Sequence, residues 1–145
     1  MPAFQYDPAS VSVIVAGKIM TGFAEDSAVT VERMTDTWTD QVGTDGFVTR
    51  AKSNDQRGTV TVNLTQTSPS NDDLQVMATA DELSGNGAGP FLLRDGSGRT
   101  ICSGDTCWIV KTPSLEFART AGTRQWSIRV AHLIVFAAGN STVGA

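Results

Sequence analysis

Apolar and polar residues alternate along several short stretches of the chain, as they do in β-strands that bury one face. The clearest stretch is 58–65, in which Val60, Val62 and Leu64 lie on one side and hydroxyl and amide side chains on the other. Further stretches with strand character are 11–16, 29–33, 91–93, 99–102, 107–111, 115–119 and 124–136. Glycine-containing turn segments separate several of them. The pattern predicts a mainly β fold.

One α-helix is predicted at about residues 69–84. Ser68 is a typical N-cap residue, and Pro69 suits the first position of a helix because its missing N–H would have no partner there. Apolar residues then recur at three- and four-residue spacing, at Leu74, Met77, Ala78 and Leu83. Such a stripe lays one face of the helix on a sheet, and Gly85 would end the helix.

Residues 35–53 predict a projecting β-hairpin, because two strand-like arms flank the turn segment at 43–46. Neither face of the first arm is apolar enough to join a domain core. A ribbon with open edges and an isolated tryptophan needs a partner, and packing on another subunit would supply one. The alternative is a mobile surface hairpin. On the first interpretation the subunit interface contains Trp38, Val42, Phe47, Val48 and Arg50.

The composition fits one domain, 1–145, with one core. Apolar residues make up 40% of the 145 residues and charged residues 18%, which excludes a disordered tail. No apolar run approaches the ~20 residues of a membrane-spanning helix, so we expect no membrane association. The first residues lack the pattern of a secretory signal, and we expect a protein made and used without export.

The net charge of −4 argues against a nucleic-acid-binding surface, which depends on clustered Lys and Arg. The charge is unevenly distributed along the chain. Residues 58–98 hold one base and five acids, whereas residues 99–145 hold five bases and two acids. Opposite patches would suit contact between copies of the chain, although ordinary surface variation explains them equally well.

The two cysteines, Cys102 and Cys107, flank a segment that is typical of a hairpin turn at 103–105. Such a turn would bring them nearly opposite each other, so a disulfide is geometrically conceivable. Reduced thiols are favoured in a chain that is not exported. A single histidine and the lack of a second cysteine pair disfavour zinc. We expect chemically inert cysteines within strands.

No segment of the sequence predicts a catalytic, metal or cofactor site, and we expect a protein that is not an enzyme. His132 lies in an apolar run without an obvious partner, so a hydrogen-bonded histidine in a strand is expected there and not a general base. The glycines at 85–89 follow a helix and precede a strand, which is the wrong order for a phosphate loop. The acid pairs at 72–73 and 81–82 are explained by helix capping and exposure.

Read together, these segments resemble the small tail tube proteins of tailed bacteriophages. The most specific part is 58–71, where a strand feeds directly into Thr-Ser-Pro and the helix. The other matching segments are 16–18, 29–33, 43–46, 113–119 and 125–128. The resemblance covers about residues 10–136. The cysteine pair and the apolar segment 133–136 depart from it, and the role of that last segment is open.

The resemblance implies a β-sandwich or barrel-like domain with one flanking α-helix at about 69–84 and the projecting hairpin at about 35–53. It further implies that six copies form a ring, that adjoining sheets continue into a shared inner barrel, and that rings stack head to tail into a hollow tube. The genome would pass through that tube during ejection. The chain would then belong to the virion tail, assembled in the cytoplasm of the bacterial host.

The partners that the resemblance implies are further copies of the chain, a tape-measure protein and DNA in the lumen, a sheath protein outside a contractile tail, and baseplate and tail terminator proteins at the ends. Two other interpretations stay open. The chain could form the tube of another injection machine or a tail-completion ring. It could also be a monomeric β-sandwich module that binds sugar or peptide, although its three tryptophans lie far apart in the sequence.

Overall fold

The computed structural model describes residues 11–22, 29–95 and 100–138. The elements in chain order are β1 (Ser12–Val15), β2 (Lys18–Ile19), β3 (Val29–Arg33), β4 (Trp38–Val42), β5 (Val48–Lys52), β6 (Gly58–Thr65), α1 (Ser70–Ser84), β7 (Gly89–Arg94), β8 (Thr100–Lys111), β9 (Thr123–Val130) and β10 (Ile134–Ala137). The predicted mainly β fold with one helix is confirmed.

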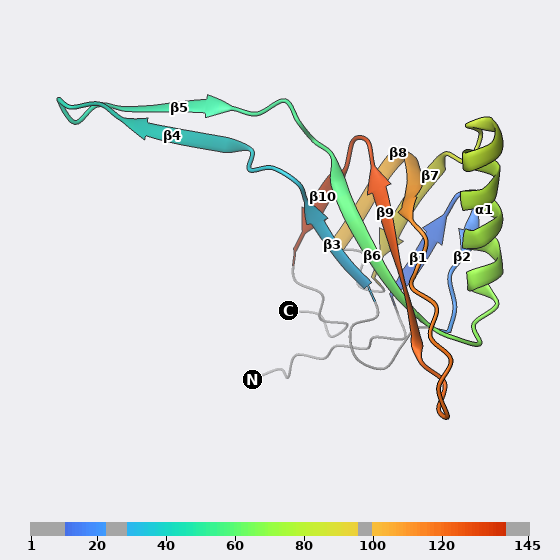
Figure 1. Ribbon diagram of the computed structural model, residues 1–145. Helices are drawn as coiled ribbons and strands as arrows, with labels where there is room; N and C mark the ends of the chain where they lie inside the picture. The colour runs from blue at the N-terminus through green and yellow to red at the C-terminus, as the bar shows by residue number, and fades with distance from the viewer. Residues whose placement is uncertain (1–10, 23–28, 96–99, 139–145) are drawn as a thin grey trace, which may run out of the picture.

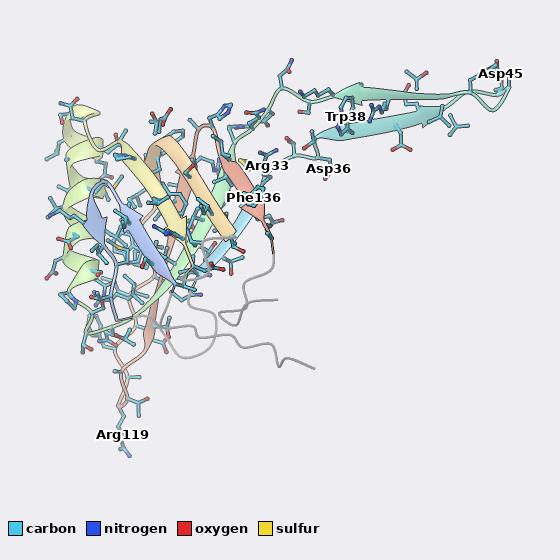
Figure 2. The ribbon with its side chains drawn as sticks, turned by 180° about the vertical axis from the view of Figure 1, so that it is seen from behind. Arg33, Asp36, Trp38, Asp45, Arg119 and Phe136 are labelled. Carbon is cyan, nitrogen blue, oxygen red and sulfur yellow. The ribbon has the colours of Figure 1, made fainter. Side chains whose placement is uncertain are left out.

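One antiparallel sheet forms the body of the protein. Its strand order is β2-β1-β7-β8-β9-β6-β3, and β10 pairs with β8 beside this path. The sheet curls over so that β3, β6 and β9 lie in front of β1, β7 and β8 in Figure 1, and the order is reversed in the view from behind in Figure 2. The two layers enclose the core as a sandwich, and α1 stands beside β1 and β2.

The centre of the core lies under β6, where the two-residue alternation is complete. Val60, Val62 and Leu64 are fully buried, and the residues between them are half-buried on the outer face. The neighbouring strand β9 alternates in the same way. Because both strands turn their branched and aromatic side chains inward, the apolar area removed from water lies between the layers.

Helix α1 begins at Ser70, with Pro69 in the cap position, one residue later than predicted. Ser68 nevertheless satisfies a helical donor, because its Oγ accepts a hydrogen bond from the Ser70 N–H at 3.2 Å. Leu74 and Met77 are buried as expected. Leu83 is 83% exposed, so its place in the apolar stripe was predicted wrongly. It follows Leu74 by nine residues, which is two and a half turns, and it therefore lies on the opposite side.

The predicted turn at 103–105 is wrong, because β8 is one continuous strand of 12 residues. Its first half pairs with β10 and its second half with β9. A Cβ at Gly104 would overlap the side chain of Val130, so the glycine allows these segments to approach closely. The register against β7 shifts between Gly89 and Phe91, and this irregularity turns residues on both sides of it inward.

Both cysteines are therefore buried and carry free thiols. Burial raises the pKa of Cys107 to about 11 and also raises the pKa of Cys102. A thiol with a raised pKa holds little thiolate at neutral pH, and the thiolate is the reactive form. Both cysteines lie within a strand as expected, and their thiols are free.

The predicted strand 124–136 is interrupted at a bend over residues 131–133. Leu133 turns fully into the core, and its side chain occupies the space that a Cβ at Gly58 would fill. Its N–H donates to the carbonyl of Gln56 at 2.8 Å, and its carbonyl accepts from Arg33 Nη2 at 2.9 Å. His132 is therefore exposed at the bend, and its prediction as a strand residue is wrong.

Residues 115–119 do not form the predicted strand. The segment 112–122 is a loop that leaves the body between β8 and β9, with Arg119 at its outer end in Figure 2. Leu115 and Phe117 are 65% and 77% exposed. Their alternation has no strand beside it, since β8 and β9 pair with each other only nearer the body. The predicted turn at 95–98 lies mostly outside the described residues.

The helix is joined to the sheet through Asn71, which is buried. Its Oδ1 accepts a hydrogen bond from Trp126 Nε1 at 2.9 Å. Its Nδ2 donates to the carbonyls of Thr65 at 3.0 Å and Ser68 at 3.1 Å. The amide side chain of Asn71 thus provides hydrogen-bond partners for the buried indole N–H and for the carbonyls at and after the end of β6. These bonds hold α1 against the core.

We predict that Asn71→Ala lowers the free energy of unfolding by about 2–3 kcal/mol, because a buried indole N–H and two carbonyls lose their partner. Urea unfolding followed by tryptophan fluorescence measures the change. Gln75→Ala on the exposed side of the same helix is the control and should change stability by less than about 0.5 kcal/mol. Equal stability of both variants would contradict the role of Asn71.

Candidate subunit interface

The β4–β5 hairpin stands apart from the body as a separate two-stranded sheet. Its register pairs Trp38 with Lys52, Asp40 with Arg50 and Val42 with Val48. Figures 1 and 2 show the ribbon extending sideways from the top of the sandwich, with Asp45 at its far tip and Trp38 well outside the body. The predicted projecting hairpin at about 35–53 is confirmed.

A short turn closes the hairpin. Gly43 donates its N–H to the carbonyl of Phe47 at 2.9 Å, and Gly46 donates to Gly43 at 3.0 Å. Gly46 has φ 87°, a left-handed conformation that glycine adopts without steric cost. The turn residues therefore account for the sharp reversal that the sequence predicted at 43–46.

Four of the five predicted interface residues share one face of the ribbon. Trp38, Val42, Val48 and Arg50 occupy directly or diagonally opposed positions of the register. The guanidinium carbon of Arg50 lies 3.9 Å from the centroid of the Trp38 ring, a cation–π contact that holds both side chains across the two strands. Phe47 precedes Val48, so alternation assigns it to the other face.

The apolar side chains on the ribbon are unusually exposed. Phe47 is 75% accessible, Val42 67%, Val48 64% and Trp38 44%. Every described residue of both strands is exposed. Asp40, Arg50 and Lys52 lie among the apolar residues of the Trp38 face. Apolar side chains this exposed on an isolated ribbon, with charged residues beside them, are typical of a protein–protein contact.

The root of the hairpin is rigidly hydrogen-bonded. Arg57 contacts Asp55 in a two-pronged pair, with Nε to Oδ1 and Nη2 to Oδ2 both at 2.9 Å. The hydroxyl of Thr35 donates to the Asp55 carbonyl at 3.1 Å, and Met34 N–H donates to the Arg57 carbonyl at 3.0 Å. The bonds of Thr35 and Met34 join the two segments that lead into the ribbon, and the Asp55–Arg57 pair orders the second of them.

The ion pair at the root changes the titration of its carboxylate. The Arg57 side chain donates hydrogen bonds to Asp55 and lowers the pKa of Asp55 to about 2. A depressed pKa means that the pair stabilises the fold fully above the ordinary pKa of aspartate and ceases to do so as the pH falls through about 2. The pair is therefore intact across the neutral range.

The other candidate sites stay dispersed. No three His, Cys, Asp or Glu side chains among the described residues cluster closely enough to hold a metal ion. Asp73 lies 3.7 Å from Lys18, and the Oδ1 of Asp81 accepts a hydrogen bond from the Gly87 N–H at 3.4 Å. No helix within the described ranges is long and apolar enough to cross a membrane.

Two exposed apolar surfaces were not predicted from the sequence. The first is the loop with Leu115 and Phe117, whose alternation had indicated a strand. The second is β10, where Ile134 and Phe136 are 55% and 63% exposed. The signal for β10 was present in the apolar segment 133–136, but an apolar run by itself does not show which side of it is covered.

The fold is shared with solved proteins that terminate tubes in other assemblies. The fold is similar to the sheath/tube terminator of the PVC extracellular contractile injection system, with a TM-score of 0.67, 10% identity, and 93% and 99% of the two chains covered. It is also similar to the tube terminating cap of the anti-feeding prophage, with a TM-score of 0.62, 11% identity, and 95% and 96% covered.

Sequence comparison narrows this class to one family. The family model described as "Bacteriophage PhiTE tail tube protein" matches residues 9–136. The structural protein ORF10 of Pseudomonas phage KPP10 is 34% identical over 146 residues, which covers 95% of this chain and 84% of that protein. The chain therefore belongs to the PhiTE tail tube protein family of bacteriophages, and the predicted resemblance to phage tail tube proteins is confirmed.

We predict that the Asp55 carboxyl titrates with a pKa of about 2 in the native chain and with a higher pKa in Arg57→Gln, where the backbone N–H of residue 57 still donates to Asp55 but the guanidinium no longer does. The neutral amide keeps the shape of the side chain but removes the charge and the two-pronged contact. Carbon-detected NMR of the carboxyl group measures both values. An identical titration in the two proteins would contradict the assigned ion pair.

Proposed function

We propose that the chain is a tail tube subunit whose copies form six-membered rings that stack head to tail into a hollow tube. The observation that carries the proposal is the ribbon of β4 and β5, an ordered hairpin with exposed apolar side chains and no packing on its own body. Membership of a tail tube family supports the same conclusion. The role is structural, and the genome passes through the assembled tube during ejection.

The hairpin would supply the contact between neighbouring copies. Trp38, Val42, Val48 and Arg50 share one face with Asp40 and Lys52, and Phe47 lies on the opposite face near the turn. A ribbon that is apolar on both sides near its tip suits insertion between two surfaces. The Trp38–Arg50 stack matches the residue types that dominate binding energy at protein interfaces.

Rigid attachment makes the ribbon suitable for this contact. The hydrogen bonds of Thr35 and Met34 to the segment 55–57 order the root before any partner arrives, so less conformational entropy is lost on association. Because the ribbon of one copy would contact a different surface on the next, the contact is heterologous and repeats without limit. Another component must then set the length of the tube, which fits partners at its ends and a tape-measure protein within it.

A second candidate function is a single ring that closes the end of a tube. Two of the solved structures of similar fold are a terminator and a terminating cap. A sheath protein outside the tube is a further partner that fits this class, since one of the structures contains sheath and tube together. The two functions differ in one property, because a tube subunit polymerises and a terminator stops at one ring.

We predict that Trp38→Ala weakens stacking while the subunit stays folded, since loss of an interface tryptophan costs about 2 kcal/mol or more per contact. The protein concentration needed to form tubes should rise more than about tenfold. Electron microscopy of a dilution series measures it. Val76→Ala on α1 removes an apolar side chain that is more exposed than Trp38, at 67% against 44%, and should leave the threshold unchanged. Identical thresholds for Trp38→Ala and the parent chain would remove Trp38 from the interface.

Native mass spectrometry and negative-stain microscopy of the parent chain test the proposed function itself. We expect six-membered rings and hollow rods that lengthen with concentration. Discrete rings that never elongate, even with tail partners present, would favour the terminating ring. A chain that stays monomeric under the same conditions would overturn both functions.

A further inference from the structure

The outward faces of the two layers of the sandwich differ in chemistry. On β3, β6 and β9 the register places Thr30 beside Thr61, and Thr61 beside Ser127. Gln125 and Thr59 extend the same outward face along β9 and β6. These side chains are exposed or half-buried, and their outer groups are hydroxyls and an amide. The outward face of β3, β6 and β9 is therefore hydrated, polar and uncharged over most of its length.

The other layer presents mostly apolar side chains, with Ser12, Arg94 and Ser103 among them. Ile19 lies opposite Ile14, Ile14 opposite Leu92, and Ile101 opposite Phe136. Ile19 and Phe136 are 65% and 63% exposed. The view from behind in Figure 2 looks onto this layer, with Phe136 on β10. A surface of this composition is unfavourable against open water.

Charge is also segregated from the polar face. The outward positions of β3, β6 and β9 carry one acid, Glu32, and one base, Arg129, both in the row that crosses Thr59. Four acids, Asp72, Asp73, Asp81 and Glu82, lie on α1, which stands beside β1 and β2 in Figure 1. The polar face thus has no net formal charge, and the acidic residues gather elsewhere.

We infer that the outward face of β3, β6 and β9 is the wall of the bore and faces the DNA duplex. The inference rests on the proposed function and adds the residues that meet the passing genome. Hydroxyl and amide groups keep a layer of bound water and exchange hydrogen bonds with it readily. They displace no counterions from phosphate, whereas each Lys or Arg on the wall would add salt-dependent affinity and retard transit.

The opposite assignment has two physical costs. A wall built from Ile14, Leu92, Ile19 and Phe136 would expose apolar area to the solvent that fills the bore. In a sheathed tail it would also place a polar hydroxyl-rich face against the sheath protein, where each unpaired group costs free energy. Both costs are avoided when the layer of β3, β6 and β9 faces the bore.

Cysteine labelling in assembled tubes tests this placement. The two native thiols are buried and have raised pKa values, so a single introduced cysteine is the reactive group. Thr61→Cys and Ser127→Cys probe the wall, and Thr79→Cys on the exposed side of α1 is the matched reference. Each variant is treated with N-ethylmaleimide and with a maleimide coupled to a folded protein wider than a DNA duplex, both as free subunits and as tubes.

We expect both wall cysteines to react with both reagents in free subunits and to lose reaction with the protein-coupled reagent in tubes, while N-ethylmaleimide still reaches them. Labelling of Thr61→Cys and Ser127→Cys in tubes by both reagents would place this face outside and overturn the inference. Labelling by neither would place it between chains and overturn it equally. In both cases tubes exist, so the proposed function stands. If the parent chain forms no tube, the proposed function fails and the inference fails with it.

Discussion

The contact between Leu133 and Gly58 is the constraint on which the arrangement of the protein depends. A side chain at position 58 would occupy the space of Leu133, which is fully buried. The backbone of Leu133 forms hydrogen bonds with the Gln56 carbonyl and the Arg33 side chain, and both residues lie on segments that lead into the ribbon. One leucine therefore ends β9, starts β10 and fixes the root of the hairpin, so the body and the projecting element are positioned together.

Sequence reasoning succeeded where the information is local. The strand 58–65 and the helix near 69–84 follow from alternation, proline and glycine within a few residues. It failed where the structure of a segment depends on contacts with residues far away in the sequence. The continuity of β8 depends on Gly104 meeting Val130, and the strand expected at 115–119 lacks a neighbour with which to pair. The bend at His132 likewise follows from the contact of Leu133 with Gly58, 75 positions earlier in the chain.

The candidate interface could be predicted from the sequence by exclusion. Neither side of the first arm could serve a core, so Trp38 and its neighbours had to lie elsewhere. The stacking of Arg50 on Trp38 was not predictable, because it depends on the register of two strands. The division of the outer surface into a hydroxyl-rich layer and an apolar layer depends on register for the same reason, since β10 pairs with β8 and not with its sequence neighbour β9.

The buried thiols of β8 have a consequence for the durability of a phage particle. Virions persist in oxidising surroundings outside the cell, where exposed thiols form disulfides. In a polymer of identical chains, every surface cysteine would face others at high local concentration. Because Cys102 and Cys107 are enclosed between the layers, oxidation in air should not cross-link adjacent copies in the proposed tube, and its subunits would keep their freedom to separate or slide.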